Sequence, residues 1–207
     1  MAEDQRTWIR HSFSLTLFTA GFHLLQFTAG AALYRTTDSP ALMTYGLDAI
    51  VSAFAALFLA IRIQRHSRID IQGNEERGRF RIVAIGYILA SLAGLFLGAR
   101  ALWFGHRPAR TVLGIALAAL SMLVIPIIGS YMKVLAVELK SQTLKAAAIF
   151  TFGNSYLSMV LLIALLLNIG MDMRWGDPLG ALVMFPFMMQ KGIQILVDEG
   201  KNEYVED

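Results

Sequence analysis

Long apolar stretches follow one another along the chain, separated by short polar segments. A membrane-spanning helix needs about 20 mostly apolar residues, and stretches of this kind occupy residues 12–34, 42–63, 80–104, 111–137, 144–168 and 177–197. We therefore predict an all-α polytopic membrane protein with six transmembrane helices. The predicted transmembrane domain, residues 12–197, lies between an N-terminal segment (1–11) and a short tail (198–207).

The composition supports a membrane protein and excludes several kinds of site. Of the 207 residues, 56% are hydrophobic and 16% are charged, against about 25% charged in soluble domains. The chain has no cysteine, which excludes disulfides, thiolate metal ligands and cysteine nucleophiles. The formal net charge of +3 is too small to indicate nucleic-acid binding. The sequence contains no glycine-rich phosphate loop and no Ser/His/Asp set, so we do not expect an enzyme.

Lysine and arginine are distributed unevenly between the two ends of the predicted helices. If the N-terminus lies inside, thirteen basic residues, Lys191 among them, fall on the inner side and five on the outer side. The positive-inside rule then places both termini in the cytoplasm. Because the sequence has no organelle-targeting pattern, we expect a bacterial-type inner membrane. The long polar loop 64–79 lies on the inner side, either as an anchor near anionic headgroups or as a loop that receives a partner or a metal.

One carboxylate lies well inside the second apolar stretch. Asp48 stands in the segment TYGLDAIVSAF, and a charged side chain at the centre of a membrane helix costs roughly 2.5 to 3.5 kcal/mol. We therefore expect Asp48 to be protonated and hydrogen-bonded, paired with another group, or part of a functional site.

The segment around Asp48 has a counterpart in the fifth apolar stretch. TYGLDAIVS and TFGNSYLS share the order threonine, aromatic residue, glycine. With one gap, Asp48 aligns with Asn154, and Ser52 aligns with Ser158. Each stretch then carries two polar side chains four residues apart, on one face of a helix. Because each half of the chain has three predicted helices, the second half is expected to run inverted relative to the first.

The depths of these four residues in the membrane agree. At 1.5 Å per residue, Ser52 lies about 15 Å from the outer end of its predicted helix, and Asn154 about 15 Å from the inner end of its own. In a hydrocarbon core about 30 Å thick these two share one layer, and Asp48 and Ser158 share the next. Our hypothesis is that four polar groups converge near the midplane. The alternative for the serines is ordinary interhelical hydrogen bonding, worth about 0.6 kcal/mol each.

These motifs resemble the membrane domain of the cation diffusion facilitator, or cation efflux, family. The resemblance spans about residues 12–197 and rests on Asp48 in the second helix and on the Asp-Pro-aliphatic-Gly opening of the sixth, WGDPLGAL. It implies a 3+3 arrangement with both termini inside. It also implies a metal site on the second and fifth helices, where four Asp or His ligands bind a zinc-like ion and exchange it for protons. The corresponding residues here are Asp48, Ser52, Asn154 and Ser158.

The sequence departs from the family pattern in its ligands. Zinc prefers thiolate, imidazole and carboxylate ligands, whereas serine and asparagine suit a harder cation. The family's C-terminal cytoplasmic domain has no counterpart after residue 197. Two hypotheses follow. The first is a dimeric divalent-cation/proton antiporter for a zinc-like ion, with Asp48 as ligand and proton carrier. The second is a transport-inactive relative that serves as a structural or assembly subunit of a larger membrane complex.

Two apolar stripes bear on the second hypothesis. Residues at four-residue spacing form a small-residue stripe in the third helix: Gly86, Ala90, Gly94 and Gly98. Such stripes let helix backbones approach closely, within the chain or across a dimer. The methionine and phenylalanine stripe MFPFMMQ (184–190) in the sixth helix favours adaptable packing against lipid or a partner helix.

Several other polar residues have alternative interpretations. His23 and Gln26 in the first helix complete the polar cluster, or His23 is neutral and donates to a backbone carbonyl. His106, in an outer loop, is expected to be structural. The charged residues near the start of the sixth helix are expected to be solvated or paired; these are Asp172, Arg174 and Asp177.

Overall fold

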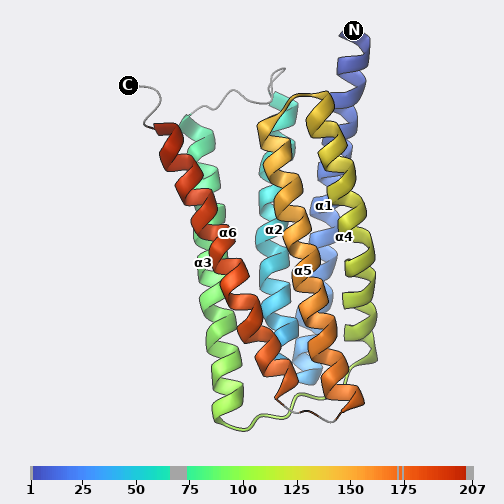
Figure 1. Ribbon diagram of the computed structural model, residues 1–207, viewed down its shortest axis with the longest axis vertical. Coiled ribbons are helices and arrows are strands. Elements are labelled where there is room, and N and C mark those ends of the chain that lie inside the picture. The colour runs from blue at the N-terminus through green and yellow to red at the C-terminus, as the bar shows by residue number, and fades with distance from the viewer. Residues whose placement is uncertain (1, 66–73, 172, 174, 204–207) are drawn as a thin grey trace.

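The computed structural model describes residues 2–65, 74–171, 173 and 175–203, and within these residues it contains six α-helices and no strand. The helices are α1 (Ala2–Thr37), α2 (Pro40–Arg65), α3 (Asn74–Trp103), α4 (Val112–Glu138), α5 (Gln142–Gly170) and α6 (Gly176–Glu203) (Figure 1). Each predicted apolar stretch falls on one helix and extends at most one residue beyond it, although several helices are longer than predicted, α1 by ten residues at its start. This confirms the all-α fold with six helices. The prediction for loop 64–79 falls largely on residues 66–73, outside the described residues.

Five of the helices, α2 to α6, are long and apolar enough to cross a membrane. Helix α1 falls short of that hydropathy because polar residues line its buried face: Ser12, Thr16, Thr19, His23 and Gln26. The outer surface of the bundle exposes large apolar side chains, among them Ile82, Leu89, Phe96, Leu123 and Ile127. Soluble proteins do not present so much contiguous apolar surface to water. The arrangement is that of an integral membrane protein, with polar groups inside and apolar groups facing lipid.

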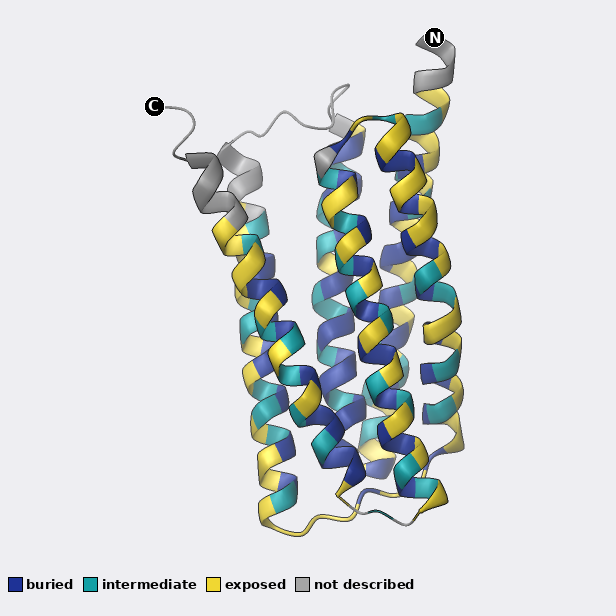
Figure 2. Cartoon of the chain, viewed as in Figure 1, coloured by how far each residue is buried: buried dark blue, intermediate teal, exposed yellow. Residues whose placement is uncertain are grey.

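The six helices pack mainly in pairs, α1 with α2, α4 with α5, and α3 with α6. Helix α2 is the centre of the bundle, since it also contacts α3, α5 and α6. Figure 1 shows both chain ends at the same end of the bundle, and Figure 2 shows buried positions running along most of α2. The polar residues of α2 therefore lie where the other helices can reach them.

The small-residue stripe of α3 packs inside the chain. Gly86 and Gly94 face α2, and a Cβ atom added to Gly94 would lie 2.5 Å from the side chain of Thr44. Gly98 faces α6, where an added Cβ would lie 2.9 Å from the carbonyl oxygen of Pro178. Close approach of three helices therefore accounts for the stripe. Of the two alternatives, packing within the chain and packing across a dimer, the structure shows the first.

Two methionines of the methionine and phenylalanine stripe of α6 turn inward. Met184 and Met188 are fully buried in the main apolar core, and the ring of Phe187 packs 4.4 Å from that of Tyr156 on α5. The expectation of packing against lipid or a partner helix is therefore wrong for the two methionines, which fill gaps between helices of this chain. Their unbranched side chains suit such irregular spaces.

Asp177 joins the beginning of α6 to the beginning of α2. Its carboxylate is buried and accepts hydrogen bonds from Ser39 Oγ (2.5 Å) and from the backbone N–H of Ala41 (3.0 Å). A carboxylate near two helix N-termini is stabilised by their unpaired N–H groups and dipoles. The Asp-Pro opening of α6 thus fixes the N-terminal end of α2, and Asp177 is paired through hydrogen bonds rather than solvated. Asp172 and Arg174 lie outside the described residues.

Candidate functional site

Lys191 of α6 is inserted between the two central residues of the predicted site. Its Nζ donates a hydrogen bond to Asp48 Oδ1 of α2 at 2.9 Å and another to Asn154 Oδ1 of α5. All three side chains are buried, with relative exposures of 5% for Lys191, 2% for Asp48 and 4% for Asn154. The carboxylate and the amide oxygen therefore converge on one positively charged nitrogen. The charge of Asp48 is paired, as one of the three expectations stated.

The backbone around Lys191 explains how its ammonium reaches the middle of the bundle. Helical side chains point toward the N-terminus of their helix, so the lysine stem runs from the inner half of α6 toward its outer half. The stem passes Gly153 of α5, where an added Cβ would lie 3.4 Å from the lysine Cε. An alanine at this position would be in ordinary van der Waals contact with the stem, so the glycine adds space beside the lysine without being required for it.

A fourth helix, α3, closes the site with an aromatic ring. The ring centroid of Tyr87 on α3 lies 5.3 Å from Lys191 Nζ, within the range of a cation–π contact. The hydroxyl of Tyr87 forms a 2.9 Å hydrogen bond with Ser52 Oγ, and Ser52 Oγ accepts a 3.0 Å bond from Asn154 Nδ2. Ser52 and Asn154 are therefore in direct contact, as their equal predicted depths require.

His23 extends the site toward α1. Its Nδ1 lies 2.6 Å from Gln26 Oε1, which can only accept, so Nδ1 carries the proton and the neutral ring presents an unprotonated Nε2. That Nε2 accepts a 3.3 Å hydrogen bond from Asn154 Nδ2. The expectation of a neutral histidine bonded to a backbone carbonyl is wrong about the partner, which is the side chain of Gln26. An imidazole nitrogen therefore stands beside the amide that contacts Lys191.

A second layer of hydrogen bonds supports this arrangement. Gln26 Nε2 donates to Tyr45 OH (2.7 Å) and to Ser121 Oγ (2.8 Å), and Tyr45 OH lies 2.9 Å from Ser158 Oγ. Ser158 in turn donates to the backbone carbonyl of Asn154. Among the described residues, no hydrogen bond joins Ser158 to Lys191 or Asp48. Ser158 therefore orients the helix turn that carries Asn154, and its role as a metal ligand stays a prediction.

Sequence reasoning assigned Lys191 to the cytoplasmic surface, which the structure corrects. Lysines near helix ends usually extend toward water, and for this reason the positive-inside rule includes Lys191 among the basic residues of the inner side. The sequence nevertheless indicates that Lys191 can be buried. Among the basic residues within the six predicted stretches, Lys191 lies farthest from an end, six residues before residue 197. A buried acid needs a partner, and the most deeply placed lysine was the candidate.

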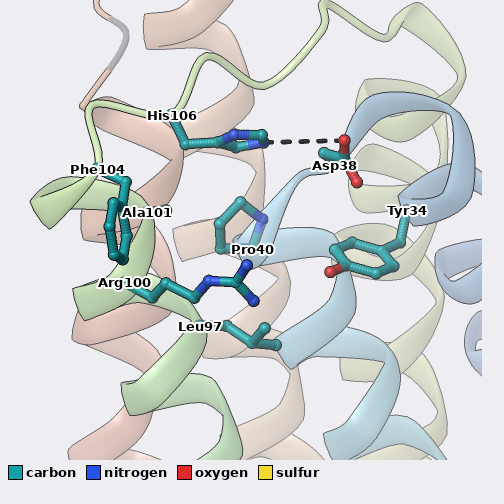
Figure 3. Close-up of a pocket in the computed structure, with 8 residues that line it drawn as sticks. All are labelled: Tyr34, Asp38, Pro40, Leu97, Arg100, Ala101, Phe104 and His106. Carbon is teal, nitrogen blue, oxygen red and sulfur yellow. Dashed lines mark ion pairs between the residues drawn. The ribbon is translucent and has the colours of Figure 1, made fainter.

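A separate pocket of about 330 Å³ lies where α1 and α3 end and α2 begins (Figure 3). His106 Nε2 lies 3.9 Å from Asp38 Oδ2 across its mouth, and Arg100 extends into it. The contact with Asp38 agrees with the structural role expected for His106. The pocket shares no lining residue with the Lys191 site.

The site has the position of a metal centre but a different donor set. Within the described part of the chain, no group of three or more His, Asp or Glu side chains could hold a metal ion. Around Lys191 the available donors are one carboxylate, one amide oxygen, one hydroxyl and the imidazole of His23. Oxygen donors of this kind suit harder cations than zinc. Chemically, the arrangement can hold one cation, and the protein's own ammonium now fills that position.

Fold and site together define a helical integral membrane protein with a buried polar centre, in which a lysine is bonded to an aspartate and an asparagine. A comparison with known protein families matches residues 16–202 to the cation efflux transmembrane domain. Because the match covers most of the chain, this protein belongs to the cation efflux family. A search of curated proteins found no match.

Proposed function

We propose that this protein carries a divalent cation across the membrane in exchange for protons, through the site between α2 and α5. The observation that supports the proposal is that Asp48 and Asn154 direct their oxygens at a single cationic nitrogen in the middle of the bundle. A polar site at that depth is costly, and such sites in membrane proteins are functional by default. Asp48 is the principal ligand, with Asn154 and Ser52 completing the oxygen set.

The donor set narrows the class of cation. A zinc-like ion was expected from the family resemblance, but three of the four equivalent positions here are hydroxyls or an amide. We therefore propose Mn²⁺ or a similarly hard divalent cation as the better cargo, with Zn²⁺ as the comparison. The setting we propose is a bacterial-type inner membrane, with both termini in the cytoplasm and two copies forming a dimer. We assign no catalytic reaction and no nucleic-acid partner.

The test is uptake of Mn²⁺ and Zn²⁺ into inverted membrane vesicles that contain the protein. Asp48→Asn removes the charged ligand, and we expect uptake to fall to the level of empty vesicles. The matched control is Asp38→Asn, the same substitution at an exposed acid at the outer end of α1. Its backbone has a φ of 50°, a conformation that asparagine tolerates. Equal uptake by Asp48→Asn and the parent protein would rule out the site.

A gain of activity separates lost transport from lost folding. Asn154→Asp keeps the shape of the side chain and adds the second carboxylate that the family pattern contains. We expect half-maximal uptake at a cation concentration at least about tenfold lower, since a second charge adds about 1.4 kcal/mol or more of binding. Misfolding cannot produce such a gain.

The second candidate is a transport-inactive subunit of a membrane complex, because Lys191 already fills the cation position. The sequence offers two stripes as surfaces for partner proteins, but residues of both pack within this chain. The small-residue stripe of α3 packs on α2 and α6, and two methionines of the α6 stripe are buried. The subunit proposal expects co-purification with a fixed partner in mild detergent and no uptake of either cation. Cation uptake by a purified homodimer in liposomes would contradict it.

A further inference from the structure

Lys191 occupies the space and the ligands that a transported cation would need. Its Nζ uses the oxygens of both Asp48 and Asn154. A second cation cannot approach those oxygens at bonding distance while the ammonium is present, because like charges a few ångströms apart repel strongly in an interior of low polarity. The Lys191 ammonium therefore competes with a transported cation for the oxygens of Asp48 and Asn154.

We propose that Lys191 determines the cation specificity of this protein: its ammonium is a tethered cation that holds the empty site together and must withdraw when cargo binds. This inference rests on the proposed cation-carrier function and adds a role for a residue on α6, outside the four positions predicted from the sequence. The ammonium stands in for the cargo between Asp48 and Asn154, so the two occupy the site alternately.

The geometry gives the ammonium somewhere to go. Its four-carbon stem is flexible, and it lies beside Gly153 of α5, which has no side chain to obstruct its movement. The ring of Tyr87 is already within cation–π range at 5.3 Å, so the ammonium can keep a favourable contact as it leaves the oxygens. Lys191 therefore need not enter an apolar environment without a partner.

The covalent attachment of the Lys191 ammonium to the chain affects which cations can bind. A ligand attached to the chain competes at an effective concentration that is commonly in the millimolar range or above. Free Na⁺ or K⁺ carries the same single charge and gains no more from Asp48 than the ammonium does, so neither can displace it. A divalent cation gains about twice the electrostatic attraction. Lys191 thus excludes monovalent ions and admits divalent ones.

Binding of Mn²⁺ to the purified protein in detergent tests this proposal. Lys191→Met removes the charge and keeps a long side chain, and we expect Mn²⁺ to bind at least about tenfold more tightly than to the parent protein. Lys191→Arg keeps a permanent charge, and we expect affinity no higher than that of the parent. In Lys191→Met, K⁺ should become able to compete with Mn²⁺, whereas the parent protein should be insensitive to K⁺.

A second measurement uses the unaltered protein and does not depend on the folding of a variant. Acetylation of lysines by an amine-reactive reagent, read by mass spectrometry, reports how accessible each ammonium is. We expect saturating Mn²⁺ to increase labelling of Lys191 by several-fold, because its nitrogen is then released from the hydrogen bonds to Asp48 and Asn154 that hold it in the absence of cargo. Labelling of the exposed residues Lys133 and Lys140 should stay constant.

The outcomes separate this inference from the proposed function. If the parent binds Mn²⁺ but Lys191→Met binds it no more tightly, or if bound Mn²⁺ leaves Lys191 labelling unchanged, the competition is overturned and the carrier function stands. If neither protein binds Mn²⁺, the carrier function fails. If only Lys191→Met binds Mn²⁺, the lysine is a permanent occupant, which overturns both its withdrawal and divalent transport by the natural protein.

Discussion

Single residues decide how this chain tolerates charge at bilayer depth. Asp48 and Lys191 are each expensive to bury alone, and each is bonded to the other at 2.9 Å. A buried pair of this kind is not a large source of stability, because desolvation of two ions offsets most of their attraction. What it does impose is a strong penalty for changing one partner without the other.

Asp48→Asn should therefore destabilise the protein more than removal of both charges. The single variant leaves the ammonium of Lys191 buried without its carboxylate, at a cost of about 3–5 kcal/mol. The double variant Asp48→Asn/Lys191→Met leaves no buried charge and should recover most of that loss. The measurement is the free energy of unfolding in a denaturing-detergent titration, with Asp38→Asn as the control, expected within about 0.5 kcal/mol of the parent. A double variant no more stable than the single one would show that the two charges are not coupled.

The sequence predicted the acid of this pair but not the base. Asp48 stands out because it interrupts an apolar stretch at mid-depth, whereas Lys191 lies six residues from the predicted end of its helix, where lysines usually reach water. Only the tilt and packing of α6 turn the side chain inward. The contact between Ser52 and Asn154 could be predicted because two antiparallel helices of known length fix relative depth. The partner of His23 could not, because it depends on helix rotation.

At the scale of elements, apolar length is enough to locate the helices. Each of the six stretches predicted one helix because every backbone N–H and C=O in a bilayer must be satisfied internally, which leaves the helix as the economical choice. Which side of each helix faces the core was less predictable from the sequence. Apolar residues surround most of these helices, so lipid-facing and core-facing sides differ little in hydropathy. For this reason the predicted packing of MFPFMMQ against lipid or a partner helix does not hold for Met184 and Met188, which are buried. Small residues gave a better guide to the contact faces.

Gly98→Ala tests whether the small residues of α3 mark close contacts between helices. An added methyl group would lie 2.9 Å from the carbonyl oxygen of Pro178, so α3 and α6 must separate. We expect a loss of about 1–3 kcal/mol in the free energy of unfolding, as for other overpacked contacts. Gly21→Ala is the matched control, because an added Cβ there meets nothing within 4 Å and the same helix-propensity gain applies. If both variants have the stability of the parent, the α3–α6 contact is looser than the structure indicates.

At the scale of the whole molecule, the main issue is whether α1 crosses the membrane with the other five helices. Its hydropathy falls below theirs, but the reason is a polar face that lies inside the bundle against α2 and α4. Figure 1 shows α1 beside α2 through the height of the bundle, with the N- and C-termini at one end. The polar residues of α1 therefore indicate a buried role in the site, where His23 reaches Asn154, rather than a helix outside the bilayer.

Reporter fusions distinguish the two topologies. With six spans, fluorescent protein fused to either terminus should fluoresce, and alkaline phosphatase inserted after His106 should be active, because that loop would face the periplasm. The charge bias still supports this orientation after Lys191 is moved from the surface to the site, since the remaining inner basic residues outnumber the outer ones about two to one. With five spans, the two termini would lie on opposite sides, and only one terminal fusion would fluoresce. That result would also remove His23 from bilayer depth, so the hydrogen bond between His23 and Asn154 requires the six-span outcome.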